Sequence, residues 1–219
     1  MKKLSRFQKI LIPAVILSVV LILGILVPDL VANLSASHWQ DKTEKTYNQM
    51  VYDPMHHYKL TIKRETTEGK QTRQRECWLW NRNHLYITRE EGDALAYELV
   101  VNSDIYKKIV TPENPDVPWE YTGSGIDMDP SKTSLQGRNL VFSRINGTLT
   151  GPEVTYEKID PQGIQVTFRF KWDGTLTGIT ASLRSERVPY REDVYTFLET
   201  DDKEIRDTIK EAFNEAIKG

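Results

Sequence analysis

The feature that most constrains this chain is an apolar run near its N-terminus, Ile10 to Val27, which contains no charged residue. As a helix the run would be about 27 Å long at 1.5 Å per residue, close to the thickness of the hydrocarbon core of a bilayer. Pro28 and Asp29 follow the run, and basic residues precede it. Those basic residues are Lys2, Lys3, Arg6 and Lys9. A run of this length and composition predicts a membrane-spanning helix.

The flanking charges predict the orientation of this helix. Basic residues stay on the cytoplasmic side of a membrane by the positive-inside rule. We therefore expect a cytoplasmic tail over residues 1–9, a transmembrane signal anchor over 10–28, and a single extracytoplasmic domain over 29–219. The predicted location is the cell membrane, crossed once, with the domain outside. The membrane, met through residues 10–28, is then the first partner of this chain.

A cleaved signal peptide is the alternative interpretation of the run. Signal peptides have an apolar region of about 7 to 15 residues and a cleavage site that follows small residues in an A-x-A pattern. The nearest sites here end at Ala32 and Ala36, but Leu30 and Leu34 stand where the pattern needs a small residue. The run is also longer than a signal peptide needs, so a retained anchor is favoured.

The charge balance limits the partners of the outer domain. The chain has 29 basic and 31 acidic residues, and four basic residues precede the run, which leaves 25 against 31. A domain with this acidic excess is unsuited to nucleic acid, because neutralising phosphates needs a net basic surface. The stretch from Lys59 to Arg89 is a local exception, with eight basic residues against three acids. This stretch could contact anionic lipid headgroups or wall polymers. The alternative is a solvated face of mixed charge, which is the commoner explanation for such a stretch.

The period of the apolar residues predicts a helix followed by strands. Ser37 and Gln40 resemble a capping box, so a first helix is expected over residues 38–52. After Pro54, apolar and polar residues alternate over 58–63, which is the pattern of a strand. Further strand-like runs cover 74–81, 84–89, 94–101 and 104–110. The short breaks between these runs suit an antiparallel meander.

The clearest strand covers residues 164–172, where Phe168, Phe170 and Trp172 point to one face. Asp173 and Gly174 follow it as a two-residue type I′ turn, and the chain returns through a second strand. The string Asn146-Gly147-Thr148-Leu149-Thr150-Gly151 repeats the pattern of this turn 27 residues earlier, which predicts another strand, Asx-Gly turn and strand. Shared turn chemistry explains this echo better than a duplication does.

The chain ends in a helix expected over residues 201–218. Asp201 and Glu204 resemble a capping box, and an apolar stripe follows them. The stripe consists of Ile205, Ile209, Ala212, Phe213, Ala216 and Ile217. The predicted fold class is α+β, mainly antiparallel β: a transmembrane helix, then a curved β meander or half-barrel flanked by an N-terminal and a C-terminal helix.

The sequence contains no complete set of catalytic or metal-binding residues. The lone Cys77 excludes an internal disulfide and a zinc site with two or more thiolates. Arg75 and Glu76 precede it, so it lacks the Thr-Leu-x-Thr-Cys pattern of sortase-type transpeptidases. His56 and His57 are adjacent and would face opposite sides of a strand. We predict no metal, no cofactor and no enzyme activity.

The segment around Asp127 matches two further motifs only in part. Asp127, Asp129 and Ser131 are spaced like the first ligands of a calcium loop, but Lys132 stands at the glycine position. Asp127 also stands where the Ser-Met-x-Pro motif of signal peptidases has its nucleophile. Neither chemistry is therefore predicted here.

Aromatic residues are the candidate binding residues. Trp119 and Tyr121 lie in the segment 111–137, which is rich in proline and glycine and is expected to be a loop over the sheet. Trp78 and Trp80 lie on a predicted strand within the basic stretch. Aromatic residues are enriched at binding hot spots, although on strands they more often belong to the core.

The order of helix, long meander, turn-rich loop, further hairpins and closing helix resembles the half-barrel of LolA-type lipoprotein carriers and their envelope relatives. The resemblance covers most of residues 38–218 and includes the string Trp80-Asn81-Arg82-Asn83-His84-Leu85-Tyr86. It implies a curved sheet whose concave face holds an acyl chain or a partner peptide. A retained anchor departs from the soluble carriers.

These observations favour a non-catalytic, membrane-anchored binding or sensory module on the outer face of a bacterial, Gram-positive membrane, with an envelope protein or a lipid as partner. The alternative is a LolA-like carrier or binder of an apolar ligand. The third candidate is an envelope hydrolase or transpeptidase. A contiguous apolar concavity would favour the carrier, and a filled core would favour the binding module.

Overall fold

The computed structural model describes residues 6–52, 55–125, 140–158, 163–185 and 188–218. Three helices are described: α1 (Arg6–Leu34), α2 (Ala36–Tyr52) and α4 (Asp202–Ala216). The first strands are β1 (Met55–Thr66), β2 (Gly69–Trp80), β3 (Asn83–Arg89), β4 (Leu95–Val101), β5 (Asp104–Val110) and β6 (Glu120–Ser124). The others are β7 (Val141–Gly147), β8 (Pro152–Glu157), β9 (Ile164–Phe170), β10 (Leu176–Ser185) and β11 (Val188–Phe197).

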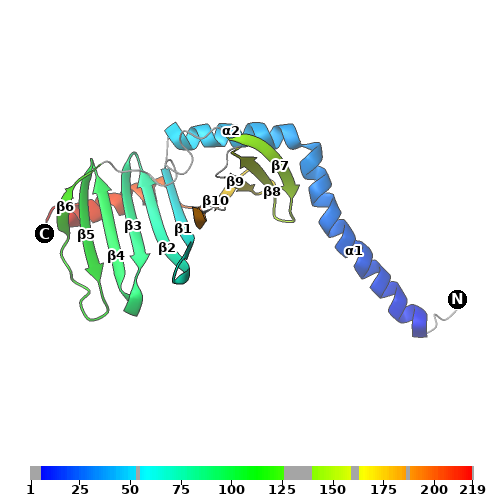
Figure 1. Ribbon diagram of the computed structural model, residues 1–219, viewed down its shortest axis with the longest axis horizontal. Helices are drawn as coiled ribbons and strands as arrows, with labels where there is room; N and C mark the ends of the chain where they lie inside the picture. Colours follow the sequence, from blue (N-terminus) through cyan, green and yellow to red (C-terminus); the bar gives the residue numbers. More distant parts are fainter. Residues whose placement is uncertain (1–5, 53–54, 126–139, 159–162, 186–187, 219) are drawn as a thin grey trace.

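The strands form one open antiparallel sheet of eleven strands in the order β6-β5-β4-β3-β2-β1-β11-β10-β9-β8-β7. Two meanders, β1 to β6 and β7 to β11, are joined where β1 pairs with β11, from Tyr58 opposite Phe197 to Arg64 opposite Arg191. The predicted fold class, an antiparallel half-barrel with flanking helices, is therefore confirmed (Figure 1).

The sheet carries a separate hydrophobic core on each face. Because side chains alternate along a strand, Cys77 and Leu79 of β2 point to one face and Trp78 and Trp80 to the other. The α2 core contains Trp39 and Met50 of α2 with inward residues of β1, β2 and β7 to β11. The α4 core lies on the opposite face, where α4 crosses β1 to β4. It consists of Leu85, Leu99, Val101, Trp119, Ile205, Ile209, Ala212 and Ala216.

The apolar N-terminal helix continues directly into the domain. Residues Ile10–Leu34 are long and apolar enough to cross a membrane, and nearly all the side chains before Pro28 are exposed. The chain continues from α1 into α2 through hydrogen bonds from Ser35 N to Val31 O and from Trp39 N to Ser35 O, both 3.1 Å. In Figure 1, α1 extends from the end of α2 away from the sheet.

The last turns of α1 pack on the sheet rather than continuing into solvent. Pro28 is buried and Ala32 is fully buried within the α2 core. The carboxylate Oδ1 of Asp29 accepts a hydrogen bond from the backbone N of Gly147 at 3.3 Å. The end of the apolar helix and the strand β7 thus form one packed unit.

The expected turns of the first meander are confirmed. Asn81 and Arg82 have φ of 46° and 69°, and Asn102 and Ser103 have φ of 52° and 75°. Positive φ at both central residues is the mark of a type I′ turn, which matches the twist of the flanking strands. Asparagine tolerates this conformation, which explains why the breaks between strands fall at these positions.

The turn predicted at Asp173-Gly174 differs in type. Gly174 has φ of 89°, but Asp173 does not have positive φ, and Lys171 N bonds Thr175 O at 2.8 Å. The connection is therefore a three-residue loop, Trp172 to Gly174, with glycine in the left-handed position. Phe168 and Phe170 are buried as predicted, whereas Trp172 lies in the loop and is 38% exposed. The prediction that Trp172 is an inward strand residue is wrong.

The related prediction at Asn146-Gly147 is also wrong. These two residues lie in β7, opposite Glu153 and Pro152 of β8. The turn instead covers the four residues 148–151. The backbone N of Thr148 donates a hydrogen bond to Gly151 O, and the backbone N of Gly151 donates one to Thr148 O. The two similar strings therefore occupy different positions in their hairpins, which argues against a shared turn as well as a duplication.

Candidate functional site

Trp119 belongs to the α4 core. It is 8% exposed, and its indole Nε1 lies 3.4 Å from Glu215 Oε2 of α4, to which it donates a hydrogen bond. The Lys108 ammonium lies 4.6 Å from the centre of its ring, and the ring of Tyr97 meets it edge to face. Trp119 stands immediately before β6, so the segment 111–137 is not one loop: it contains a strand, and residues 126–137 lie outside those described.

The other three predicted binding residues lie in two places. Trp78 and Trp80 pack against the α4 core; the Trp78 ring stacks on the imidazole of His57 at 4.4 Å, and the Lys210 ammonium lies 5.4 Å from the Trp80 ring. Tyr121 is 55% exposed on β6, an edge strand. The structure therefore gathers the three tryptophans under α4 and leaves Tyr121 on the surface.

A small pocket lies where α2, β1 and the start of α4 meet. Its volume is about 250 Å³. Its apolar lining is Met50, Met55, Leu176, Phe197, Leu198 and Ile205, and its polar lining includes His56, His57, Thr46, Gln49 and Thr200. His57 is held on both ring nitrogens, by Thr200 Oγ1 at 2.8 Å and by Glu76 Oε1 at 2.9 Å. We call this the junction pocket.

A larger groove lies at the far end of β1, β2 and β3. Most of its residues belong to the basic stretch for which the sequence suggested either an anionic partner or a solvated face. Its volume is about 960 Å³. It is lined by four arginines and two glutamates together with Ile62, Gln71, Thr72 and Gln74. The charged residues are Arg64, Arg73, Arg75, Arg89, Glu90 and Glu91. We call this the arginine groove.

The register of the first hairpin brings the arginines together. Leu60 lies opposite Arg75, Ile62 opposite Arg73 and Arg64 opposite Gln71. Because residues two apart share a face of a strand, Arg64, Arg73 and Arg75 project on the same side of the sheet. The basic excess between Lys59 and Arg89 was the sequence signal for this groove, but the count alone did not show which basic residues share a face.

Acidic partners neutralise only part of this charge. Arg73 pairs with Glu90 at 2.5 Å, and Arg89 pairs with Asp93 at 3.0 Å. Within the described ranges no ion pair is found for Arg64 or Arg75. The buried Nε of Arg75 has no hydrogen-bond partner there, and its guanidinium lies 5.6 Å from the centre of the Tyr86 ring. The arginine groove therefore keeps guanidinium groups available for an anion.

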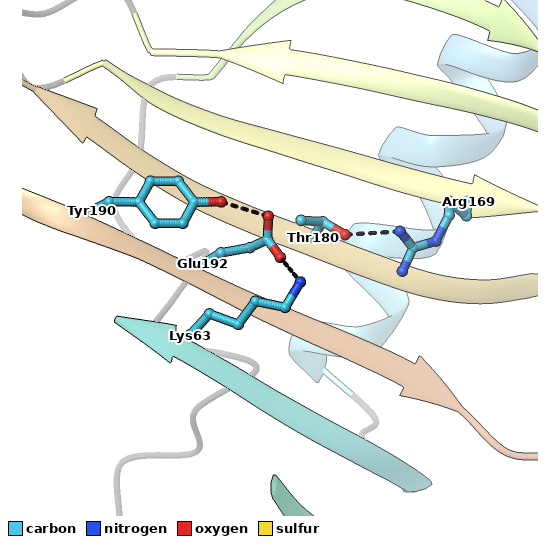
Figure 2. A network of polar contacts seen from close by, with 5 residues as sticks. All are labelled: Lys63, Arg169, Thr180, Tyr190 and Glu192. Carbon is cyan, nitrogen blue, oxygen red and sulfur yellow. Dashed lines mark hydrogen bonds and ion pairs between the residues drawn. The ribbon is translucent and has the colours of Figure 1, made fainter. Parts of the chain in front are cut away.

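On the opposite face of the sheet, polar side chains of β1 and β11 are paired with one another. Lys63, next to Arg64 in β1, donates a hydrogen bond to Glu192 Oε1 at 2.6 Å, and the Tyr190 hydroxyl donates to Glu192 Oε2 at 2.6 Å. Figure 2 shows this network with the nearby bond from Arg169 to Thr180, 2.9 Å long. Lys63 on this face is thus paired with a carboxylate, unlike Arg64 and Arg75 on the other.

The candidate nucleophile and metal ligands are placed apart. Cys77 is 1% exposed inside the α2 core, where no substrate could reach its thiol. His56 contacts the ring of Phe197 while His57 contacts Trp78 on the other face, as adjacent strand residues must. Among the residues described, no three metal-ligating side chains come together. Asp127, Asp129 and Ser131 lie outside the described ranges.

Comparison with known proteins gives a weak structural likeness. No family model and no curated protein matches the chain. A LolA superfamily protein from Nitrosomonas europaea has a TM-score of 0.35 and 9% identity, covering 75% of this chain and 95% of that one. An outer membrane lipoprotein-sorting protein domain from Vibrio parahaemolyticus has a TM-score of 0.26 and 8% identity, covering 76% and 97%. Both are proteins of the kind that the order of elements resembles, and the likeness at these values is weak.

Proposed function

We propose that this chain is a non-catalytic binding module held on the outer face of a bacterial membrane by α1, with the arginine groove as its ligand-binding surface. The observation that carries this proposal is the packing of Pro28 and Ala32 on the sheet. Removal of α1 as a signal peptide would take core residues with it. Cleavage after Ala32, for example, would delete a fully buried member of the α2 core.

The filled α2 core supports a binding module over a carrier. Four inward residues of β8 to β10, Val154, Val166, Phe168 and Ile179, are at most 1% exposed. A carrier of acyl chains needs an apolar cavity, and pockets for small ligands have volumes of about 300 to 1,000 Å³. The arginine groove has a volume in that range, but its lining is mostly polar and charged.

Carriage of an apolar ligand is the second candidate, and the junction pocket favours it. Six apolar side chains line that pocket, although its volume of about 250 Å³ is small. Mass spectrometry of the chain extracted from its membrane under native conditions distinguishes the two. A bound lipid that is lost in a Met55→Trp variant, whose larger side chain would fill the junction pocket, would favour the carrier.

Expression of the full chain with a C-terminal tag tests the anchored module. We expect the intact mass, including residues 1–32, in the membrane fraction, and loss of the tagged domain when protoplasts are treated with protease. A soluble product that begins near residue 33 or 37 would contradict the proposal. So would full protection of the tag, which would mean that the domain lies inside.

A further inference from the structure

We propose that the arginine groove binds the phosphodiester headgroups of anionic lipids in the membrane that holds α1. This inference rests on the proposed function, because it needs α1 to remain attached and the domain to lie outside. It adds the ligand class and assigns a second contact between the protein and the bilayer.

The first argument is the chemistry of the groove. A guanidinium group is planar, always charged and matches two oxygens of a phosphate with two parallel hydrogen bonds. Four arginines line the groove against two glutamates, and one of those glutamates is engaged by Arg73. The side-chain amides of Gln71 and Gln74 add uncharged donors. This donor set fits a monoanionic phosphodiester better than an apolar or a cationic ligand.

The second argument is that Arg75 has an unused hydrogen-bond donor and a guanidinium group held in place. Burial of an arginine nitrogen without a partner is costly, because the group loses its hydrogen bonds to water. The buried Nε of Arg75 has none within the described part of the chain, while contact with the Tyr86 ring holds the guanidinium in place. A phosphodiester in the groove would supply the missing acceptor.

The third argument is the position of the groove relative to α1. In Figure 1, α1 and the β1–β2 hairpin both extend from α2 toward the same side of the molecule. The path along β1 from Met55 to Arg64 is roughly 30 Å at about 3.3 Å per residue. The path along α1 from Ser35 back to Val27, where the apolar run ends, is only about 12 Å. The hairpin is therefore long enough to reach the level at which the headgroups lie.

The fourth argument is the charge of the rest of the domain. The outer domain has more acidic than basic residues, so an anionic membrane would repel most of its surface. The arginine groove, with four arginines against two glutamates, has the opposite sign. Attraction at this one surface, combined with the anchor, would hold the domain in a defined orientation on the bilayer.

Hydrogen–deuterium exchange of the full-length chain in lipid nanodiscs tests the inference. Three conditions are compared: phosphatidylcholine alone, phosphatidylcholine mixed with phosphatidylglycerol, and phosphatidylcholine alone with inorganic phosphate in the buffer. We expect the peptide that spans residues 60–76 to exchange about tenfold more slowly in the discs that contain phosphatidylglycerol, and in those only. A tenfold change corresponds to about 1.4 kcal/mol of added protection. High salt should remove most of the difference, because it screens exposed charges.

Two variants and one control make the result specific. Arg75→Gln and Arg64→Gln should each abolish most of the slowing; Arg64 is exposed, so its replacement should leave the fold intact. Arg82→Gln is the matched control, since Arg82 is exposed in the turn at the other end of β2. Slowing that persists in both groove variants, or that Arg82→Gln removes equally, would overturn the inference.

The conditions also separate the two proposals. A chain that inserts at full length but exchanges equally with both lipid compositions overturns the lipid ligand and leaves the anchored module standing. Slowing by inorganic phosphate in phosphatidylcholine overturns the lipid assignment in favour of a soluble phosphate-bearing ligand. A chain that fails to insert overturns both proposals.

Discussion

The backbone carbonyl of Pro28 lies directly against Gly147, so closely that a Cβ on Gly147 would be 1.9 Å from the carbonyl oxygen. This contact joins the end of α1 to β7, and only a residue without a side chain permits it. Together with the bond between Gly147 N and Asp29, it fixes how the domain is attached to the apolar helix. The glycine that the sequence suggested for a turn serves this close approach instead.

Gly147→Ala should therefore loosen α1 from the sheet. The new methyl group would meet backbone atoms that cannot move aside as a flexible side chain can, and overpacking of this kind costs about 1–3 kcal/mol. We expect a lower melting temperature and faster hydrogen exchange over residues 28–34. Gly24→Ala is the control, because nothing lies within 4 Å of a Cβ built there. Equal stability of the two variants would show that the contact is not tight.

Trp119→Ala should destabilise the domain by about 3–5 kcal/mol, the usual range for removing a buried aromatic side chain. Trp119 is 8% exposed and contacts α4, so its loss leaves a cavity under that helix. Tyr121→Ala, two residues away on the exposed edge strand, should leave the melting temperature within a few degrees. Urea unfolding of both variants measures the difference. A Trp119→Ala protein as stable as the wild type would show that Trp119 does not support the packing of α4, and would favour its role as a binding residue.

Local patterns predicted much of the first meander. The alternation at Tyr58, Leu60 and Ile62 marks the inward face of β1, and asparagines mark the left-handed turns between strands. The capping residue Asp201 also behaves as predicted, accepting a hydrogen bond from Lys203 N at 2.7 Å. Each of these features depends on residues that are near in sequence, where propensity and pattern carry information.

Long-range pairing could not be predicted in the same way. The pairing of β1 with β11 joins residues about 130 positions apart in the chain, such as Leu60 and Tyr195, and nothing in either strand specifies the other. The assignment of α2 and α4 to opposite faces is equally non-local. β2 has apolar residues on both faces, which predicts burial of both but not which helix covers Trp78 and Trp80. The three tryptophans among the predicted binding residues therefore lie in or against the α4 core, whereas Tyr121 is exposed on β6.

The pH dependence of stability at high pH should depend on Tyr156. Burial, and then the carboxylates of Glu44 and Asp41, raise the pKa of its hydroxyl from 10.0 to about 12. Below pH 10 the hydroxyl is protonated in both states, so stability is unaffected. Between pH 10 and about 12 the unfolded chain loses this proton while the folded chain keeps it, so stability falls as the pH rises.

Tyr156→Phe removes this titration with little change of shape. The hydrogen bond that the hydroxyl donates to Gln40 O is long, at 3.5 Å, so the bond that is lost is weak. We expect the loss of stability between pH 8 and pH 11, measured by urea unfolding, to be smaller in the variant than in the wild type. The other tyrosines are present in both proteins and cancel in the comparison. An identical loss in the two proteins would contradict the assignment.

Stability at low pH should depend on Glu192. The hydrogen bond from Lys63, and then that from Tyr190, lower the pKa of its carboxyl group (Figure 2). The carboxylate therefore stabilises the fold at pH values above the pKa of an unfolded glutamate, about 4.3, and this contribution is lost as the pH falls through the lower pKa of the folded state.

Glu192→Gln should reduce stability at pH 7 by about 0.5–1 kcal/mol, as expected for a partly exposed ion pair, and should reduce the further loss on going to pH 3. Glu120→Gln, an exposed carboxylate on the edge strand β6, is the control and should change neither value. Urea unfolding at the two pH values gives both quantities, and a Glu192→Gln protein with the pH dependence of the wild type would show that the network in Figure 2 does not contribute to acid sensitivity.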